Sequence, residues 1–391
     1  MAYRVFTHDA RLRRNAEALA SRGDSVDVVC LGMPGHSYTG PVKIISFPAL
    51  RYRGKSKARY LVHYLHFFWR AFSIITCRSL RRRYDIVMAI SMPDALVFGC
   101  LVAKILGSKV ILDITDMMPE LYRDRFGSKL WDLGGKVLSI EERLSAKAAD
   151  RVLAVHDLHR QRLESAGIDP AKIRVVMNSP DPKVFYCARA SRSSKREFVV
   201  VYHGSLIRRL GIDTAIQAIA IARAKIPELR LRIIGTGDYI AEAEDLVKRL
   251  HLEDTVIFEG FVPLEEVVRS VAKADVGLVP NHVSEVTHFM LPMKLLEYAS
   301  MGVPIIATRL RAIEHYFGSD AVRYFKSGDA LDLATAIEEL YLHPEQAAVL
   351  SRRGRAALEA IGWDKQREQY YDALDTVGVA QTEPLTRASG A

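Results

Sequence analysis

Short apolar runs alternate with longer amphipathic patterns along almost the whole chain, and this alternation is the strongest constraint on its fold. A short apolar run bounded by turn residues is typical of a buried strand, whereas apolar residues that recur at helical spacing are typical of a helix. Strands that alternate with helices form parallel sheets covered on both faces. We therefore predict an α/β protein, with helices that include 11–22, 93–106, 212–224 and 330–342. The predicted strands are 26–31, 44–47, 85–90, 110–114, 151–155, 174–177, 198–202, 230–234, 256–258, 276–279 and 304–307.

A polar stretch at residues 181–197, which has no apolar periodicity, interrupts this alternation. The chain has 391 residues, enough for two domains of common size, so we interpret the stretch as a linker between two doubly wound domains. Because such domains bind ligands at the carboxyl ends of their strands, two Rossmann-like domains are expected to face each other across one cleft. The predicted boundaries are 1–182 for the N-terminal domain, 183–197 for the linker, 198–362 for the C-terminal domain, 363–377 for a final helix and 378–391 for a disordered tail.

The segment 291–308 predicts a loop, a helix and then a buried strand. Pro292 suits the first turn of a helix, and Gly302 suits the position just past its end. The unpaired amides at the start of a helix favour phosphate oxygens. Lys294 lies in that first turn, with Glu297 one turn later on the same face. A cation for phosphate and a carboxylate for sugar hydroxyls indicate a nucleotide-sugar pocket; an ordinary α/β crossover with a surface Lys–Glu pair fits the same spacing.

The formal net charge of +9 is concentrated in one segment. Between Asp27 and Asp85 there is no acidic residue, while eleven residues are basic. Apolar and aromatic residues recur at helical spacing from Leu61 to Ile75, which predicts an amphipathic helix. Such a helix either lies in the headgroup region of an anionic bilayer or packs on its own sheet. Nucleic acid is not an expected partner, because no recognition module accompanies the charge. The predicted membrane or acceptor contacts are Arg51, Arg53, Lys55, Lys57, Arg59, Trp69, Arg81, Arg82 and Arg83.

The cysteines and the apolar runs bear on the compartment. Four widely spaced cysteines without a CxxC pair argue against a zinc site and a disulfide framework, and fit a reducing cytosol. The first residues lack the apolar core of a signal peptide, and no run reaches the ~18 apolar residues that span a bilayer. We expect a cytoplasmic protein, peripheral on the inner face of the cytoplasmic membrane.

Six sequence blocks resemble the landmarks of the family-four retaining glycosyltransferases, in the branch typical of surface polysaccharide biosynthesis. Residues 291–308 match the pattern LPxKxxEYxxxGxPxxA, and the other blocks follow in the family's order. The resemblance covers nearly the whole chain and implies the GT-B architecture. It implies an acceptor site in the N-terminal domain, a nucleotide sugar mainly in the C-terminal one, and a final helix that crosses back to the first domain. The other blocks are 113–120 (DITDMMPE), 175–181 (VVMNSPD), 202–213 (YHGSLIRRLGID), 232–238 (RIIGTGD) and 256–263 (VIFEGFVP).

The resemblance also implies how the donor diphosphate is bound. Gly204 follows a strand, and a glycine there lets a diphosphate approach the backbone. Relatives carry an arginine directly after this glycine and a lysine before the next one, where this chain has Ser205 and Leu210. The cation is then Arg208 or Arg209, and the sequence leaves this choice open.

Glu297 matches the glutamate that holds the ribose in relatives. Its usual acidic partner, eight residues earlier, is replaced by Phe289. Phe261 falls where relatives contact the base, although a plain core role fits it equally. The predicted donor-binding residues are Gly204, Gly237, Phe261, Met290, Leu291, Pro292, Lys294 and Glu297.

Polar residues after the predicted strand 110–114 indicate the acceptor side. Relatives carry a histidine where this chain has Thr115, beside an aspartate that matches Asp116. A carboxylate there accepts the acceptor hydroxyl's proton or orients the sugar. Glu120 fits a helix-capping role as well, and His203 fits a structural role. The predicted catalytic residues are Asp116, Lys294, Arg208 and Arg209.

We therefore expect a retaining hexosyltransferase that transfers a sugar from a nucleoside diphosphate to a hydroxyl of a lipid-linked or polysaccharide acceptor. No metal or cofactor is expected, because no DxD-type acidic pair lies near the donor pocket. Two alternatives remain open: a nucleotide-sugar epimerase or phosphorylase on the same fold, and a non-catalytic membrane-associated binding protein. The nucleobase, the sugar, the acceptor and the oligomeric state are not fixed by the sequence.

Overall fold

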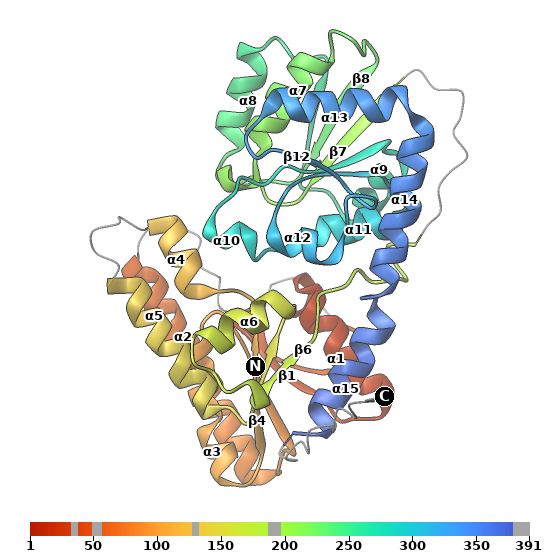
Figure 1. The fold of residues 1–391 in the computed structure, drawn as a ribbon. Helices are drawn as coiled ribbons and strands as arrows, with labels where there is room; N and C mark the ends of the chain where they lie inside the picture. Colours follow the sequence, from red (N-terminus) through yellow and green to blue (C-terminus); the bar gives the residue numbers. More distant parts are fainter. Residues whose placement is uncertain (33–37, 49–56, 127–132, 187–196, 378–391) are drawn as a thin grey trace, which may run out of the picture. The chain divides into compact units, whose positions relative to one another are not determined.

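The computed structural model of the chain describes residues 1–32, 38–48, 57–126, 133–186 and 197–377. The chain divides into two compact units, Met1–Met177 with Gln366–Ala391, and Asn178–Lys365 (Figure 1). Every strand pairing in both units is parallel, which confirms the predicted fold class. The predicted disordered tail and most of the predicted linker lie outside the described residues.

The N-terminal unit contains two groups of parallel strands. One has the order β3-β4-β5-β6 and the other pairs β1 with β2. The first residues of the chain join them, because Ala2 pairs with Ile90 of β3 and Val5 pairs with Leu31 of β1. The strands are β1 (Asp27–Gly32), β2 (Lys43–Pro48), β3 (Ile86–Ile90), β4 (Lys109–Ile114), β5 (Arg151–Ala154) and β6 (Ile173–Val175).

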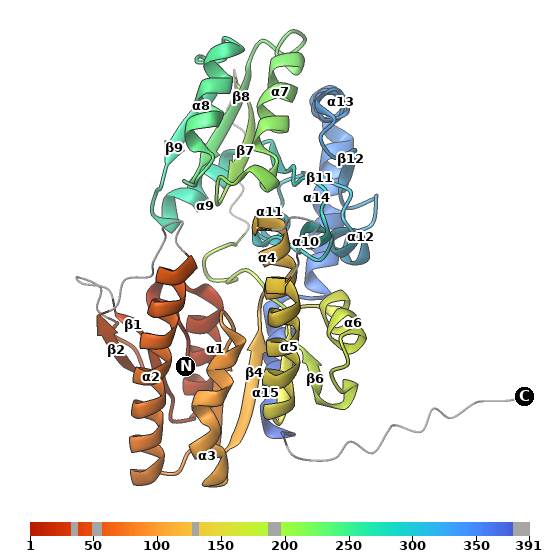
Figure 2. The same ribbon diagram turned by 90° about the vertical axis from the view of Figure 1, so that its left-hand side faces the viewer.

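Helices cover both faces of this sheet. On one face, α2, the 3-10 helix η2, α3 and α5 pack on the core that contains Phe67, Leu96 and Leu112 (Figure 2). On the other face, α1 packs with Leu12 on β1, and α15 packs with Tyr370 on β4 and β5. The elements are η1 (Phe6–His8), α1 (Ala10–Arg22), α2 (Lys57–Arg81), η2 (Asp94–Cys100), α3 (Leu101–Ile105), α4 (Met118–Phe126), α5 (Leu133–Ala148), α6 (Asp157–Ser165), η3 (Pro170–Lys172) and α15 (Trp363–Asp375).

The C-terminal unit has one six-stranded sheet in the order β12-β11-β10-β7-β8-β9. This is the doubly wound order, and its direction reverses between β7 and β10. Alternate residues of β7 enter two cores, with Val200 and Tyr202 on one face and Val199 and Val201 on the other. The continuous apolar sequence of β7 is therefore explained by burial of this strand on both faces. The strands are β7 (Phe198–His203), β8 (Leu229–Ile234), β9 (Val256–Gly260), β10 (Val276–Val279), β11 (Ile305–Thr308) and β12 (Arg323–Phe325).

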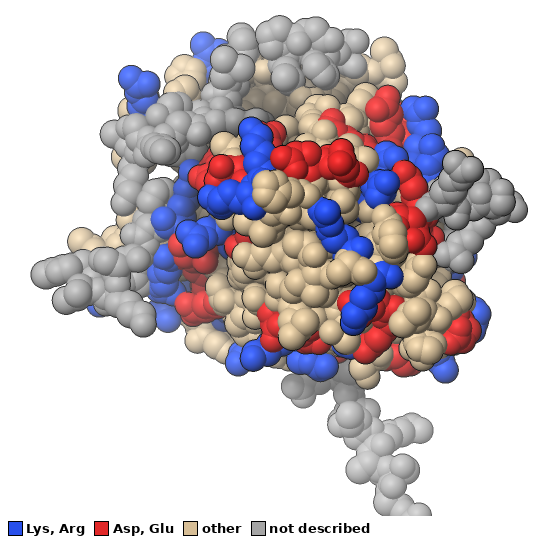
Figure 3. Space-filling model, turned by 90° about the horizontal axis from the view of Figure 1, so that it is seen from above, with Lys and Arg blue, Asp and Glu red and all other residues tan. Residues whose placement is uncertain are grey.

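The first of these cores is covered by α7, α8 and α13, and the second by α9, α11, α12 and α14. Figure 3 shows that acidic and basic side chains are interspersed on the face of this unit seen from above. The elements are η4 (Arg208–Leu210), α7 (Ile212–Ala222), α8 (Ile240–Arg249), α9 (Leu264–Lys273), α10 (Glu285–His288), α11 (Met293–Met301), α12 (Arg311–Tyr316), α13 (Ala330–Leu342) and α14 (Pro344–Glu359).

Two elements differ from the sequence-based expectation. The helix expected at 93–106 begins as a 3-10 helix and becomes an α-helix only at Leu101. Gly99 lies in its 3-10 part, and a Cβ added there would come 2.9 Å from Met1 Cε, so this tight turn packs directly on the start of the chain. The short edge strand β12 was not predicted. Within the described residues, no helix is long and apolar enough to cross a membrane.

Candidate active site

Three glycines bring the loops after β7, β8 and β9 together. Gly204, Gly235 and Gly260 have φ angles of 115°, 132° and 68°, which L side chains rarely adopt. The amide of Gly204 donates to Ile234 O at 2.9 Å, and that of Gly235 donates to Gly260 O at 2.7 Å. A Cβ on Gly235 would lie 2.0 Å from Gly204 O. Only glycine permits this approach, which leaves a side-chain-free surface at the strand ends.

Gly237 has a packing role in the same region. A Cβ added to it would lie 2.1 Å from Leu206 O. Leu206 in turn accepts from the amide of Tyr239 at 3.0 Å, so the loops after β7 and β8 are held edge to edge. The Gly235-Thr236-Gly237 sequence is therefore explained by the close contact of these two loops.

Helix α11 places Lys294 against this glycine surface. The helix has Pro292 as its N-cap, without a side-chain cap, and ends at Gly302 with a φ of 67°. Lys294 is 8% exposed, and its Nζ lies 3.5 Å from the centre of the Tyr202 ring. A Cβ on Gly204 would lie 3.6 Å from the same Nζ. Among the described residues this ammonium has no hydrogen-bond partner. The buried Lys294 ammonium and the uncapped amides at the start of α11 together favour the binding of an anion.

Glu297 lies one turn further along α11 and is also nearly buried. Its Oε2 lies 3.3 Å from His203 Nε2, without hydrogen-bond geometry. The His203 ring is held edge-on against Tyr298, with ring centroids 5.0 Å apart. The backbone amide of His203 donates to the Tyr298 hydroxyl at 3.3 Å, and this hydroxyl donates to Val201 O. His203 and Glu297 are thus fixed by the strand and helix that carry them.

Burial shifts the protonation of all three groups. It lowers the pKa of Lys294 to about 7, against the opposing effect of Glu297. It raises the pKa of Glu297 to about 7, against the opposing effect of Lys294. Burial, followed by the nearby charge of Lys294, lowers the pKa of His203 to about 3, so this imidazole is neutral at pH 7. A bound anion favours the charged form of Lys294.

The two candidate arginines of η4 occupy different surroundings. Arg208 is exposed and lines an open hollow with Asp238, Glu242 and Asp245. Arg209 is half-buried, and its carbonyl accepts from the amide of His282 at 2.9 Å, which ties it to the loop after β10. Arg249 also lines this hollow and pairs with Asp245, so three carboxylates face two arginines there. The excess of carboxylates disfavours a diphosphate, so the surroundings favour Arg209.

The other predicted donor residues differ in their exposure. Phe261 follows Gly260 and is 84% exposed, so the core role left open for it is wrong. Met290, Leu291 and Pro292 are half-buried in the turn before α11. Phe289 ends α10, whose start is fixed by a capping box.

Sequence reasoning missed several residues of this unit. Tyr202 supplies the ring under Lys294, and His203 faces Glu297; both belong to the YHG tripeptide at the strand end, which was a usable signal. Asn281 follows β10 and is fully buried, with no hydrogen-bond partner for its amide group among the described residues. His203 ends β7 and Asn281 follows β10, and these are the two strands between which the direction of the sheet order reverses. Nothing in the sequence around Asn281 distinguished it from a turn residue.

In the N-terminal unit, Asp116 lies just past β4 with a side chain that is 42% exposed. Its Oδ2 accepts from the Thr115 hydroxyl at 3.0 Å. Arg4 donates to that hydroxyl at 2.6 Å and to Asp9 at 2.6 Å, and lies 3.7 Å from Asp116. Thr115 thus carries a polar connection from Arg4 to Asp116. Asp113 is fully buried and paired with Arg11 at 2.8 Å, so it has a structural role.

Two further polar residues of this unit are structural. Glu120 accepts two bonds from one Arg162 nitrogen at 2.7 and 2.8 Å, so it is a buried ion-pair partner rather than a cap. His156 is the N-cap of α6 and accepts from the amide of His159.

The predicted membrane contacts are only partly described. Arg51, Arg53 and Lys55 lie outside the described residues, and Lys57 is the first residue of α2. Arg59, Arg81, Arg82 and Arg83 are exposed on or just past α2, and Trp69 is 60% exposed.

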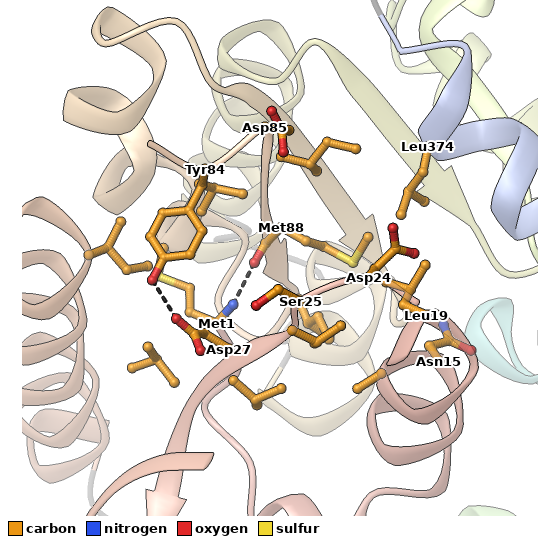
Figure 4. A pocket seen from close by; sticks show the side chains of 18 of the residues that line it. Met1, Asn15, Leu19, Asp24, Ser25, Asp27, Tyr84, Asp85, Met88 and Leu374 are labelled. Carbon is orange, nitrogen blue, oxygen red and sulfur yellow. Dashed lines mark hydrogen bonds between the residues drawn. The ribbon is translucent and has the colours of Figure 1, made fainter. Parts of the chain in front are cut away.

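A cavity of about 280 Å³ lies elsewhere in the N-terminal unit (Figure 4). It is lined by the first residues of β1 and β3 and by α1, α2 and α15. Met1 is one of its lining residues, and the Met1 amino group donates to Met88 O. The Tyr84 hydroxyl donates to Asp27 at 2.6 Å. The cavity lies at the amino ends of the strands, whereas Asp116 lies at the carboxyl ends. It is therefore separate from Asp116.

Two family descriptions match this chain. Residues 8–179 match "Glycosyl transferase 4-like domain" and residues 197–343 match "Glycosyl transferases group 1". The chain is 24% identical over 320 residues to a sulfoquinovosyl transferase of Arabidopsis thaliana, covering 75% of this chain and 58% of that protein. It is 28% identical over 231 residues to a GDP-mannose-dependent phosphatidylinositol monomannoside mannosyltransferase of Mycolicibacterium smegmatis, covering 55% and 59%. The chain thus spans less than two thirds of these relatives' length.

Solved structures share the fold. A sucrose-phosphate synthase from Thermosynechococcus elongatus superposes with a TM-score of 0.72 at 20% identity, covering 95% of this chain and 93% of the other. Anabaena HepE in complex with UDP-glucose gives a TM-score of 0.69 at 15% identity, covering 96% and 98%. The fold is therefore that of the GT-B glycosyltransferases, built from two Rossmann-like domains. The chain belongs to the family-four glycosyltransferases.

Proposed function

We propose that this protein transfers a sugar, with retention of anomeric configuration, from a nucleoside diphosphate sugar to an acceptor hydroxyl. The observation that carries the proposal is Lys294, a buried ammonium without a hydrogen-bond partner in the described structure, placed between Gly204 and the start of α11. A diphosphate supplies the missing charge, and the α11 amides supply further donors. Glu297 binds the ribose hydroxyls one helical turn away.

The reaction breaks the bond between the anomeric carbon and a phosphate oxygen, and forms a bond to the acceptor oxygen. Negative charge on the departing diphosphate grows as the first bond breaks, and Lys294, the α11 amides and Arg208 or Arg209 stabilise it. The acceptor hydroxyl loses its proton to Asp116 or to the departing phosphate. Retention is inferred from the family, because the enzymes of this branch retain the anomeric configuration of the donor sugar.

Metal independence belongs to the same proposal. Fixed cations and helix amides take the place that a divalent ion fills in other glycosyltransferases. Transfer is therefore expected to continue at full rate in EDTA, and loss of activity that Mg²⁺ or Mn²⁺ restores would contradict this point.

The acceptor is proposed to be lipid-linked or a growing polysaccharide, and the protein to work on the inner face of the cytoplasmic membrane. The curated mannosyltransferase relative acts on a phosphatidylinositol mannoside, and the exposed cations of α2 fit an anionic surface. An anionic bilayer is thus a proposed partner, and nucleic acid is not.

A thermal-shift screen against UDP-, GDP-, ADP- and dTDP-sugars tests the donor assignment. Ligand at about 100 times its dissociation constant stabilises the folded state by about 2.7 kcal/mol. Glu297→Ala is the paired variant, and it is expected to lose the shift while keeping the unliganded melting temperature. No shift with any of the four donors would contradict the proposal.

Transfer to an added acceptor separates the proposal from its alternatives. An epimerase or phosphorylase would convert the donor without an acceptor hydroxyl, and a non-catalytic protein would bind the donor without turnover. Product analysis by nuclear magnetic resonance reports the anomeric configuration directly.

A further inference from the structure

The exposed apolar side chains of the N-terminal unit are confined to three neighbouring helices. Every large apolar residue that is exposed among the described residues of this unit lies on α2, on α3 with its C-cap, or on α5. Helix α2 packs on η2 and α3, and α5 packs on η2, so the three helices form one layer (Figures 1 and 2). These residues are Leu61, Val62, Leu65, Trp69 and Leu80 on α2, Leu101, Ile105 and Leu106 on α3, and Leu133, Val137, Ile140 and Leu144 on α5.

The spacing on α5 shows that this exposure is a continuous stripe. Leu133, Val137, Ile140 and Leu144 recur at helical intervals and are 68%, 56%, 57% and 52% exposed. The opposite side of α5 is buried in the core through Ala146. An amphipathic helix normally buries its single apolar stripe. Helix α5 therefore carries apolar residues both on the sheet side and on the solvent side.

The charges in this layer have one sign. Helices α2 and α3 contain no acidic residue, and α5 contains only Glu141 and Glu142. Glu142 is buried and paired with Arg162. Glu141 is half-buried, and burial raises its pKa to about 7, so this carboxyl is partly neutral at pH 7. The exposed charges on these helices are basic: Arg59, Arg70, Arg81, Lys136, Arg143 and Lys147.

We propose that the layer formed by α2, α3 and α5 docks as one surface on an anionic lipid bilayer, with α3 and α5 inserting apolar side chains beside those of α2. The proposal rests on the membrane location in the proposed function and extends it from one helix to a three-helix face. Exposed apolar groups flanked by cations, without an exposed acid, match the interfacial region of an anionic bilayer in both polarity and charge. The face of the C-terminal unit seen in Figure 3 provides a contrast, because it mixes both signs of charge.

The test is vesicle co-sedimentation of the full chain with phosphatidylcholine vesicles that contain or lack about 30% phosphatidylglycerol. The variant is Ile105→Glu with Ile140→Glu, which leaves α2 and its arginines unchanged; these side chains are 84% and 57% exposed. The matched control is Leu331→Glu with Leu342→Glu on α13, whose side chains are 63% and 66% exposed. We expect about a tenfold loss of partitioning for the variant and none for the control.

Equal partitioning of variant and wild type would overturn the proposal, as would wild-type partitioning that is the same without phosphatidylglycerol. A dimer that dissociates in the variant, seen by sedimentation equilibrium, would instead assign the face to a second copy of the chain. Donor-induced thermal shifts are recorded on the same samples. If the donor shift persists while the vesicle result fails, the docking surface alone is wrong; if wild type shows no donor shift, the proposed function is wrong.

Trp69 gives a second measurement on the same surface. The chain has three tryptophans, so Trp131→Phe with Trp363→Phe leaves Trp69 as the only one. Insertion is expected to shift its emission to shorter wavelength and to expose it to brominated lipids. An unchanged spectrum on anionic vesicles would contradict insertion at this position.

Discussion

His203 Nε2 lies 3.3 Å from Glu297 Oε2, at the carboxyl end of β7. Because burial keeps the imidazole neutral at pH 7, it carries a single ring proton. At this distance the imidazole is within reach of the Glu297 carboxylate, although the two groups have no hydrogen-bond geometry in the unliganded structure. We therefore predict that His203 positions Glu297 for the ribose hydroxyls.

His203→Phe, which keeps the aromatic contact with Tyr298, tests this role. Loss of one hydrogen bond of about 1–1.5 kcal/mol weakens donor binding by roughly five- to tenfold. The Michaelis constant for the donor is expected to rise, with kcat changed little, and His203→Asn is expected to recover part of the loss. His156→Asn, at a helix cap of the N-terminal unit, is the control. Unchanged donor affinity in His203→Phe would leave the histidine with a packing role only.

Lys294 is predicted to lower the stability of the unliganded protein. Its ammonium is buried, and its closest aromatic contact is the Tyr202 ring. Lys294→Met keeps the length of the side chain and removes a buried charge that has no hydrogen-bond partner in the described structure, which is expected to stabilise the unliganded fold by about 1–3 kcal/mol. Because the folded pKa of about 7 is below the ordinary value of 10.5, the gain is largest at and below pH 7 and shrinks as pH rises toward 10.5.

The same variant is expected to lose donor binding. Chemical denaturation at pH 7 gives the stability, and calorimetry with the nucleotide sugar gives the affinity. A less stable Lys294→Met protein would show that the ammonium is already compensated in the unliganded state.

Donor affinity is predicted to peak near pH 7. Binding of the diphosphate needs charged Lys294, so affinity falls as pH rises above its pKa of about 7. Binding of the ribose is favoured by ionised Glu297, so affinity falls as pH drops below its pKa of about 7. The profile is therefore bell-shaped, with a limit of about tenfold per pH unit on each side.

Calorimetry from about pH 5.5 to pH 8.5 with an intact nucleotide sugar checks this profile, because the terminal phosphate of a free diphosphate titrates near pH 6. Glu297→Gln is expected to remove the acid limb, and Lys294→Arg the alkaline limb. A flat profile in the wild type would show that both groups have ordinary pKa values.

The fold could be predicted from the sequence because strands buried on both faces leave long apolar runs. The end of α11 was predictable as well, since Gly302 is required where the chain adopts a positive φ. Burial of Lys294 was not predictable, because it depends on the Tyr202 ring and on Gly204, which are far away in sequence. The solvent-facing stripe of α5 was also missed, since periodicity shows that a helix is amphipathic but not which side meets the sheet.

The last prediction separates the two arginines that the sequence left open. Arg208 lines a hollow with Asp238, Glu242, Asp245 and Arg249, whereas Arg209 is half-buried and tied to the loop after β10. Arg209→Ala is expected to lower kcat by about ten- to a hundredfold, with a smaller effect on donor affinity, because charge on the diphosphate grows in the transition state. Arg208→Ala is the matched control and is expected to change kcat less than about threefold. Single-turnover rates with saturating donor measure both. A larger loss of kcat in Arg208→Ala than in Arg209→Ala would assign the diphosphate to Arg208 and place the donor at the hollow that Arg208 lines.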